Sequence, residues 1–487
     1  MAGDHWISDN DLATLKRLLE GQKKVDSGPW PLTPPVSVHR VELFIGLDSD
    51  GKRFLTRNPV EPPEDSLFAP SVGAASTTVR SPGNFLDAPG PAQPPAVPPL
   101  AEAPAVPAVT AVTAVTAAPS GPVATGPIQP HRWRGSMLAG AVADALGAPI
   151  ENDTIERIRE RTTPAGLVDF IPAYDGIGTI TDDTQMTLFT CDAMIRANIA
   201  RRTGRPSDVH QELQLSYQRW LHTQGTPWER ARGPHETSER PGGWLLDHRE
   251  LFHRRAPGAT CFFALKEYAR TGERATFTHT VNNSKGCGGV MRAAPVALWS
   301  EAPAEVFAVG AASAALTHSH PSGYLPAGAF AVIVGQLVRG GELGAAIDLA
   351  RHLLRGWDGH EETVACLEQA LRLAEQGPPT PEKVASLGGG NVGETALAIG
   401  VYSVLSTQDL SSAQLVAINH NGDSDSTGSI AGNIAGAIYG EQALHRAWLD
   451  RLELREVIST MADDALTEFG PSPRSDDQWL QRYAIPR

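Results

Sequence analysis

Apolar residues recur at helical spacing from His131 onward, in long segments rich in alanine and leucine that glycine and proline separate. One predicted face carries Met186, Phe189, Ala193 and Ala197, which follow an i, i+3, i+7, i+11 spacing. Similar spacing recurs over residues 306–316, 361–374 and 393–405. Few runs alternate in the manner of strands, so the pattern predicts an all-α domain over residues 131–470.

Small residues repeat at every fourth position in two of these segments. They are Gly135, Ala139, Ala143 and Gly147 in the first segment, and Gly428, Gly432, Gly436 and Gly440 in the second. A glycine inside a helix costs about 1 kcal/mol relative to alanine, so four in register indicate that another backbone approaches closely. Tight helix packing is therefore the simplest interpretation, and the stripes matter for what they position.

The N-terminal part of the chain has a different pattern. SDNDLATLKRLLEG predicts a short capped helix, and VHRVELFIGLDSDGKRFLTRN predicts two strands around a turn at Asp50 and Gly51. We interpret residues 1–60 as a small α+β accessory module whose partner the sequence does not identify. Residues 61–130, which include APAVPAVTAVTAVTAAPSGP, predict a disordered linker rich in proline and alanine, and residues 471–487 form a C-terminal tail.

Charge and cysteine content narrow the function classes. The 41 basic and 55 acidic residues give a net charge of −14, so no strong nucleic-acid binding is expected. Cys191, Cys261, Cys287 and Cys366 show no CxxC pairing, which predicts plain thiols in a reducing compartment. The first ten residues lack the features of a signal peptide, and the best apolar run, residues 329–338, is about half of the ~20 residues that a membrane helix needs. We expect a cytoplasmic protein with no membrane partner.

A first acidic cluster lies in GTITDDTQMTL, at the predicted start of a helix. It contains Thr181, Asp182, Asp183 and Thr184. Taken alone, this cluster is explained by a helix N-cap with acidic residues in the first turn, where carboxylates suit the helix dipole.

A second acidic cluster changes that interpretation. The segment NHNGDSDSTGSIAGN places Asp423, Asp425 and Ser426 just before the second glycine-striped helix. Two acidic clusters that met would repel each other unless cations lay between them. If the two helix starts converge, four carboxylates and two hydroxyls form an oxygen-only cage, the ligand set that Mg²⁺ or Mn²⁺ prefers.

Two further segments contain candidate binding residues. VNNSKGCGGVMRAAPVAL predicts a glycine-rich turn into a helix, where free backbone N–H groups could hold phosphate oxygens. Ser284, Lys285 and Arg292 are candidate anion partners, although such loops are more often simple sharp turns and Arg292 is alternatively a structural ion-pairing residue. LTHSHPSGYLPAGAFA contains His318 and His320, and we favour His318 as a hydrogen-bond donor that orients a ligand over a role as metal ligand.

Together these segments resemble the ADP-ribosylglycohydrolase family in order and spacing, over about residues 132–466. The resemblance is carried by RGSMLAGAVADALGAPIE, TDDTQMTL, SKGCGGVMR, THSHPSG, LGGGNVGETALAI and NHNGDSDSTGSIAGN. The family includes dinitrogenase reductase-activating enzymes and the ADP-ribosylarginine and ADP-ribosylserine hydrolases. The resemblance implies an orthogonal multi-helix bundle and hydrolysis of the N- or O-glycosidic bond that links ADP-ribose to a modified acceptor, in the first place a protein.

The resemblance also implies roles for individual residues. Two Mg²⁺ ions, with Mn²⁺ as a substitute, would be shared by Thr181, Asp182, Asp183, Asp423, Asp425 and Ser426. Glu151 matches an acidic residue beside the ribose that gates substrate access, and its alternative role is a surface salt bridge. The pyrophosphate-binding turn would consist of Ser284, Lys285, Gly286 and Cys287, with His318 shaping the cleft.

The sequence departs from the family pattern at two positions. Ala143 stands where a glycine is common before Asp144, and Asn391 stands where close bacterial relatives often have tryptophan. Neither residue is a proposed metal ligand, so we expect the metal site to be retained.

Cleavage at the anomeric carbon builds oxocarbenium-like charge on the ribose, and the leaving group must take up a proton. We expect Asp423 or Asp425 to guide that proton, with Glu151 as the third catalytic residue. Two alternatives stay open: a catalytically inactive ADP-ribose-binding protein, and an immunity protein that counters an ADP-ribosylating toxin and captures the toxin or its target through residues 1–60. The sequence does not identify the acceptor residue.

Overall fold

The computed structural model describes residues 44–47, 53–56 and 123–483. In the N-terminal unit, residues 1–103, strand β1 (Phe44–Leu47) pairs antiparallel with β2 (Arg53–Thr56). The two strands therefore flank the turn predicted from the sequence. The predicted N-terminal helix and residues 61–122 of the predicted linker lie outside the described residues.

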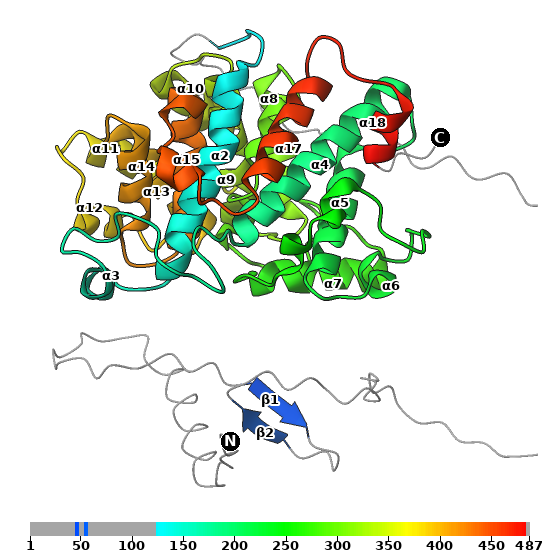
Figure 1. The fold of residues 1–487 in the computed structure, drawn as a ribbon, viewed down its shortest axis with the longest axis horizontal. Helices are drawn as coiled ribbons and strands as arrows, with labels where there is room; N and C mark the ends of the chain where they lie inside the picture. Colours follow the sequence, from blue (N-terminus) through cyan, green and yellow to red (C-terminus); the bar gives the residue numbers. More distant parts are fainter. Residues whose placement is uncertain (1–43, 48–52, 57–122, 484–487) are drawn as a thin grey trace, which may run out of the picture. The chain divides into compact units, whose positions relative to one another are not determined.

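The second unit is helical (Figure 1). Within residues 123–483 the chain forms no strand but only three isolated β-bridges, which confirms the all-α prediction for this part. Its α-helices are α2 (Pro130–Gly147), α3 (Ile155–Arg161), α4 (Asp182–Thr203), α5 (Val209–Thr223), α6 (Trp228–Ala231), α7 (Ala259–Thr271), α8 (Pro303–Ala315), α9 (Pro321–Val338), α10 (Leu343–Leu354), α11 (Glu361–Ala374), α12 (Pro381–Ala385), α13 (Gly393–Leu405), α14 (Leu410–Ile418), α15 (Ser424–Tyr439), α16 (Arg446–Leu449), α17 (Arg455–Glu468) and α18 (Asp477–Arg482). Short 3₁₀ helices are η1 (Ala148–Ile150), η2 (Trp244–Asp247), η3 (Arg249–Phe252), η4 (Cys287–Gly289), η5 (Ala294–Leu298) and η6 (Glu441–Ala443).

The three segments with helical spacing at residues 306–316, 361–374 and 393–405 form α8, α11 and α13, as predicted. Helix α9 is longer than the apolar run that the sequence suggested. By length and composition alone it could cross a membrane, with a mean hydropathy of 1.3, but 94% of that window is buried inside the domain. Because it packs against α8, α10 and α13, we describe α9 as a core helix.

Helices α2 and α15 pack side by side along their glycine stripes (Figure 1). A Cβ atom added at Gly436 would lie 2.1 Å from the carbonyl oxygen of Gly135, and one at Gly432 would lie 2.3 Å from that of Ala139. Side chains would therefore push the two backbones apart, which confirms the interpretation of both stripes as close helix packing. The pairing runs antiparallel, since Gly147 at the end of α2 meets the start of α15.

The antiparallel pairing places the end of α2 beside the second acidic cluster. A Cβ atom at Gly147 would lie 2.5 Å from the Cα atom of Asp425. The chain leaves α2 through η1 and reaches Glu151 within four residues. Glu151 is therefore brought to the carboxylates by a contact between two backbones.

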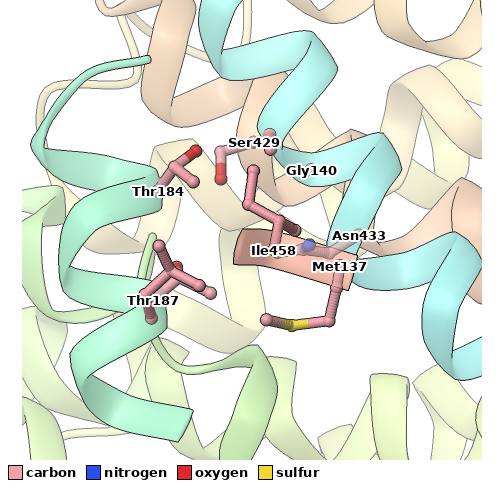
Figure 2. A pocket seen from close by; sticks show the side chains of 9 residues that line it. Met137, Gly140, Thr184, Thr187, Ser429, Asn433 and Ile458 are labelled. Atoms are coloured by element: carbon pink, nitrogen blue, oxygen red, sulfur yellow. The ribbon is translucent and has the colours of Figure 1, made fainter. Parts of the chain in front are cut away.

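Helix α4 is buried on all sides over residues 182–200, not only on the face that the spacing predicted. Its first two turns pack against α2, α15 and α17, and the small cavity left between them is about 10 Å³ in volume (Figure 2). Such a volume holds one water molecule at most. The cavity is lined by Met137, Gly140, Ala141, Thr184, Thr187, Leu188, Ser429, Asn433 and Ile458. The support beneath the start of α4 is therefore close-packed.

The C-terminal tail contains a packed helix. In α18, Trp479 is buried and its indole N–H donates to Glu468 on α17 at 3.0 Å. The buried Tyr483 donates its hydroxyl to Asp464 at 2.6 Å. These contacts make residues 477–483 part of the helical domain.

Candidate active site

The first acidic cluster forms the start of α4. Thr181 is the N-cap, and its hydroxyl oxygen accepts a hydrogen bond from the Asp183 N–H at 3.3 Å. Asp182 and Asp183 occupy the first turn, and their side chains are almost fully buried. The sequence-based interpretation of this motif as a capped helix start is therefore confirmed.

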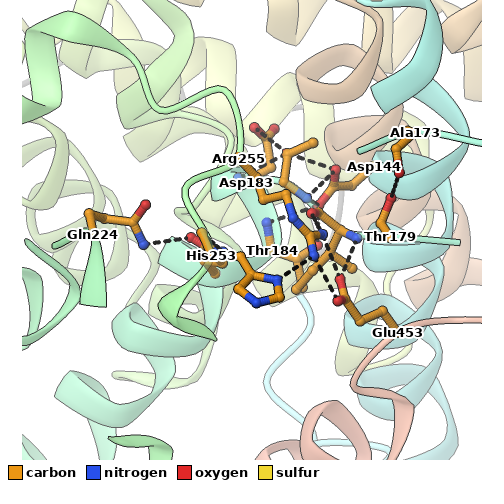
Figure 3. Close-up of polar contacts among 12 residues, drawn as sticks. Asp144, Ala173, Thr179, Asp183, Thr184, Gln224, His253, Arg255 and Glu453 are labelled. Atoms are coloured by element: carbon orange, nitrogen blue, oxygen red, sulfur yellow. Dashed lines mark hydrogen bonds and ion pairs between the residues drawn. The ribbon is translucent and has the colours of Figure 1, made fainter. Parts of the chain in front are cut away.

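A buried carboxylate on α2, Asp144, organises this helix start (Figure 3). It accepts hydrogen bonds from the backbone N–H and the hydroxyl of Thr181, at 3.1 and 2.7 Å, and from both groups of Thr184. The Thr181 hydroxyl gives its proton to Asp144 and accepts from the Asp183 N–H, so one lone pair of its oxygen remains available to a cation. Burial raises the pKa of Asp144 to about 6 even though these hydrogen bonds oppose the shift.

The role of Asp144 was not predicted from the sequence. The available signal was one acidic residue in the otherwise apolar helix LAGAVADALG. A carboxylate at such a position requires several hydrogen-bond donors. Those donors come from the TDDT segment.

The second acidic cluster forms the start of α15 in the same way. Asp423 is the N-cap and accepts from the Ser426 N–H at 3.3 Å. The Asp423 N–H donates to the carbonyl of Gly389 at 2.8 Å, which ties this helix start to the glycine-rich segment before α13. Asp423, Asp425 and Ser426 are each buried.

The two clusters converge with Glu151. Carboxylate oxygens of Glu151, Asp423 and Asp425 all lie within 4.8 Å of one another. Burial, and then the charges of Asp183 and Asp423, raise the pKa of Asp425 well above its usual value. Burial also raises the pKa of Glu151 to about 7, with a further contribution from Asp423. Glu151, which follows η1, thus shares one acidic site with residues from α4 and α15.

The donor set fits a hard divalent cation. One carboxylate oxygen of Asp183 is buried and has no hydrogen-bond partner among the described residues. Burial, followed by the neighbouring carboxylates, raises the pKa values of Asp182 and Asp183 well above normal, so these groups need positive charge to remain ionised. Oxygen ligands of this kind are those of Mg²⁺ or Mn²⁺. Glu151 makes no ion pair within the described part of the chain, so its alternative role as a surface salt bridge finds no support.

A clamp of opposite charges supports the start of α4 from the other side (Figure 3). The Asp182 N–H donates to the carbonyl of Arg255 at 3.2 Å, and the Arg255 guanidinium donates to the carbonyl of Ile180 at 3.0 Å. The same guanidinium pairs with Glu453 at 2.9 Å. This clamp joins residues far apart in sequence, and no sequence motif marks it.

The predicted pyrophosphate-binding turn lies beside the second cluster, but most of its backbone donors are engaged. The N–H groups of Ser284, Gly286 and Cys287 donate to the Asn282 side chain, the Ser284 hydroxyl and the Asn391 carbonyl, at 3.0, 3.2 and 3.2 Å. The expectation of free N–H groups is therefore not met at these three positions. The turn continues into η4 and η5, not into the longer helix that was expected.

The side chains of this turn point in different directions. The Cys287 thiol lies 2.9 Å from a carboxylate oxygen of Asp423, at the edge of the acidic site. The Lys285 ammonium pairs with Glu362 on α11 at 2.6 Å, so its charge is directed to that carboxylate. Arg292 is fully buried, which corrects its interpretation as an anion partner in favour of a structural role.

His318 is buried behind the turn with its ring facing the glycines. A Cβ atom at Gly286 would lie 3.0 Å from Nε2 of His318, so only glycine leaves room for the ring. Arg292 donates to the Thr317 hydroxyl at 2.7 Å, and that hydroxyl lies 2.8 Å from Nδ1 of His318. The hydroxyl proton has two acceptors within reach, Nδ1 and the more distant carbonyl of Ala314 at 3.3 Å. We assign the proton to the nearer Nδ1, which puts the ring proton on Nε2. Burial, and then Arg292, lower the pKa of His318 to about 3, so the ring is a neutral donor toward the turn.

We expect Thr317→Val to weaken ADP-ribose binding about five- to tenfold, because the valine cannot hold the His318 tautomer that donates from Nε2. Calorimetry with ADP-ribose measures the affinity, and ¹⁵N chemical shifts of the ring report the tautomer. Thr317→Ser keeps the hydroxyl and should retain both properties. An unchanged tautomer in Thr317→Val would contradict this assignment.

A separate surface groove of about 830 Å³ lies between residues 240–252, α17 and α18. Trp244 and Arg482 are part of its wall, with the guanidinium 3.9 Å from the indole ring centre. None of the predicted site residues lines this groove, so its size does not bear on the acidic site.

The helical domain is similar to known proteins. The sequence model of the ADP-ribosylglycohydrolase family matches residues 126–474. An ADP-ribosyl-[dinitrogen reductase] glycohydrolase of Rhodospirillum rubrum is 28% identical over 339 residues, which cover 68% of this chain and 93% of that protein. The ADP-ribosylarginine hydrolase Tri1 of Serratia proteamaculans is 25% identical over 220 residues, 45% of this chain and 56% of that protein. A solved ADP-ribosylglycohydrolase-related protein complex shares the fold, with a TM-score of 0.50, 22% identity, and coverage of 74% of this chain and 99% of that chain.

Proposed function

Since the chain belongs to the ADP-ribosylglycohydrolase family and is thus a hydrolase that removes ADP-ribose, we propose that it acts on ADP-ribosylated protein with two Mg²⁺ or Mn²⁺ ions. The observation that carries the proposal is the convergence of two buried acidic helix starts, at Asp183 and Asp425, with Glu151. The bond that breaks is the N- or O-glycosidic bond to the acceptor side chain.

The residues that would hold the ions are Thr181, Asp182, Asp183, Asp423, Asp425 and Ser426. Bound there, divalent cations supply Lewis-acid chemistry that orients the sugar and activates water. The protein contributes the fixed geometry, because Asp144 sets the orientation of Thr181 and the contact of α2 with α15 sets the position of Glu151.

Proton transfer is assigned to the carboxylates that face each other. Asp423 or Asp425 would take the proton of the attacking water and pass it to the leaving atom of the acceptor. A carboxylate oxygen of Glu151 lies within 4.8 Å of those of Asp423 and Asp425, and Glu151 is less buried than these two residues. Glu151 would therefore contact the ribose at the solvent side of the site. The neutral His318 would donate from Nε2 to the ADP-ribose beside the glycine turn.

The test offers the purified full chain ADP-ribosylated arginine, serine and nucleic acid substrates and follows free ADP-ribose by chromatography. Mg²⁺ should permit release from at least one protein-type acceptor, and EDTA should abolish it. Electron paramagnetic resonance with Mn²⁺ should count two ions per chain. Release that persists in EDTA would refute the metal-dependent mechanism.

The same experiment decides the alternative of an inactive ADP-ribose-binding or immunity protein. Such a protein would bind ADP-ribose but release none from any substrate, with or without metal. The complete carboxylate set, with each member buried or directed into the site, favours the hydrolase.

We also expect the metal-free protein to lose stability as pH rises from about 4.5 to 7. Between these values the folded protein holds a proton on Glu151 that the unfolded chain has released, so unfolding becomes easier with increasing pH, by on the order of 2 kcal/mol. Thermal unfolding in EDTA measures this slope, and Mg²⁺ should raise Tm more at pH 7.5 than at pH 5. Glu151→Gln should make the slope in EDTA shallower, and the remaining slope should come from the other buried carboxylates whose pKa values are raised. A wild-type Tm that rises over this pH range would contradict the assignment.

A further inference from the structure

The loop between α3 and α4, residues 162–181, exposes three large apolar side chains. Val168, Tyr174 and Ile177 are 47%, 45% and 48% exposed, whereas most large apolar side chains of the described domain are buried. We call these three residues the loop patch. Exposed apolar side chains that gather in one segment often mark an interaction surface.

The first part of the loop is hydrogen-bonded to Asn419, which begins the segment that contains the second acidic cluster. The Leu167 N–H donates to the Asn419 side chain at 2.7 Å, and the Asn419 amide donates back to the Leu167 carbonyl at 2.9 Å. Asp169, next to Val168, accepts from Arg451 and from the Trp448 indole N–H, at 2.5 and 2.8 Å. Val168 is therefore held outward by a fixed backbone.

The middle of the loop is a tight turn. Ala173 and Gly176 exchange backbone hydrogen bonds of 3.0 and 3.2 Å, and the Thr179 hydroxyl donates to the Ala173 carbonyl at 3.0 Å. Tyr174 lies in this turn at a φ of 52°, a left-handed conformation that costs a non-glycine residue roughly 1–2 kcal/mol. Its ring faces the Arg255 guanidinium, whose carbon is 5.1 Å from the ring centre.

The loop patch borders the acidic site. The clamp residue Arg255, which contacts Tyr174, also holds the backbone of Asp182 at 3.2 Å. Partial burial, and then the charges of Asp425 and Glu151, raise the phenol pKa of Tyr174. The loop then ends at Thr181, so a protein that covers the loop patch would lie beside the acidic site.

We infer that the loop patch is a docking surface for the acceptor protein, which it would contact while the attached ADP-ribose occupies the acidic site. The inference rests on the proposed function and deepens it, because it assigns recognition of the protein to Val168, Tyr174 and Ile177. A fixed loop that keeps apolar side chains in water gains stability when a partner covers them. The protein part of a substrate should therefore add affinity that a small ADP-ribosyl compound lacks.

The test compares two substrates with the same linkage, an ADP-ribosylated protein and the corresponding ADP-ribosylated amino acid. Val168→Asn combined with Ile177→Asn removes apolar surface without touching the proposed ligands. In the full chain with Mg²⁺, this double variant should lower kcat/KM for the protein about tenfold through a higher KM. Turnover of the small substrate should stay within about twofold of the wild type.

A matched control is Phe252→Asn, which changes an apolar side chain that is 40% exposed outside the loop. It should leave the ratio of the two substrates unchanged. Equal losses on both substrates in the double variant, no loss on either, or a wild-type enzyme that cleaves only the small substrate would each overturn the docking surface. So would a wild-type dimer that becomes a monomer in the double variant without any change in the kcat/KM ratio. A wild-type chain inert on both substrates would instead refute the proposed function, and the inference with it.

Discussion

Replacing Asp423 by alanine is expected to lower kcat about 10³-fold, close to 4 kcal/mol of transition-state stabilisation. Asp423 belongs to the trio of carboxylates within 4.8 Å of one another, and it also caps α15. The variant should also lose Mn²⁺ binding while circular dichroism shows the same helical content. Steady-state kinetics and paramagnetic resonance of Mn²⁺ measure the two losses.

The control for this variant is Asp409→Ala. Asp409 caps α14 through the Ser412 N–H at 2.9 Å, as Asp423 caps α15, but it lies at the surface. Both variants lose a helix cap, which costs about 1 kcal/mol, and only one loses a proposed metal ligand. Wild-type turnover in Asp423→Ala would remove that residue from the mechanism.

Replacing Gly436 by alanine is expected to destabilise the domain by about 3 kcal/mol or more, which lowers Tm by roughly 5 °C or more. The new Cβ atom would lie 2.1 Å from the carbonyl oxygen of Gly135 and 2.8 Å from the Ser136 nitrogen. Both are backbone atoms, so no side chain can rotate away, and α2 must separate from α15. Differential scanning calorimetry of the metal-free protein measures the change.

Gly344→Ala provides a matched control in α10. A Cβ atom there would have no other atom within 4 Å. Because alanine has a higher helix propensity than glycine, the same substitution should raise the free energy of unfolding by a few tenths to about 1 kcal/mol. The opposite signs of the two changes separate steric clash from helix propensity. A neutral Gly436→Ala variant would show that the two helices can move apart.

Local patterns were sufficient to predict several helices and the two acidic helix starts. Helices α8, α11 and α13 follow the predicted segments because each has apolar residues at helical spacing. The stripes ending at Gly147 and beginning at Gly428 predicted a close contact, and the contact is between α2 and α15. The acidic residues at both helix starts could be proposed as metal ligands because carboxylates that meet in a buried site repel one another unless a cation lies between them.

The features of the site that were not predicted depend on contacts between segments that are distant in sequence. Asp144 acts through Thr181 and Thr184, which lie 37 and 40 positions further along the chain, and nothing in the apolar helix indicates where its donors are. Arg255 and Glu453 are separated by 198 positions. The backbone N–H groups of the glycine turn were expected to have no protein partner. The Cys287 N–H, however, donates to the carbonyl of Asn391, which lies in another loop. Partners of this kind cannot be read from spacing.

The contact between α2 and α15 limits how far the proposed metal site can change shape when ions bind. Because peptide groups of the two helices touch directly, the distance from Gly147 to Asp425 cannot be altered by rotamer changes. The proposed metal site is therefore assembled in advance, and binding of ions there would require little reorganisation of the two helices. Amide protons of these two helices should accordingly exchange with deuterium among the slowest in the domain, at similar rates in apo and loaded protein.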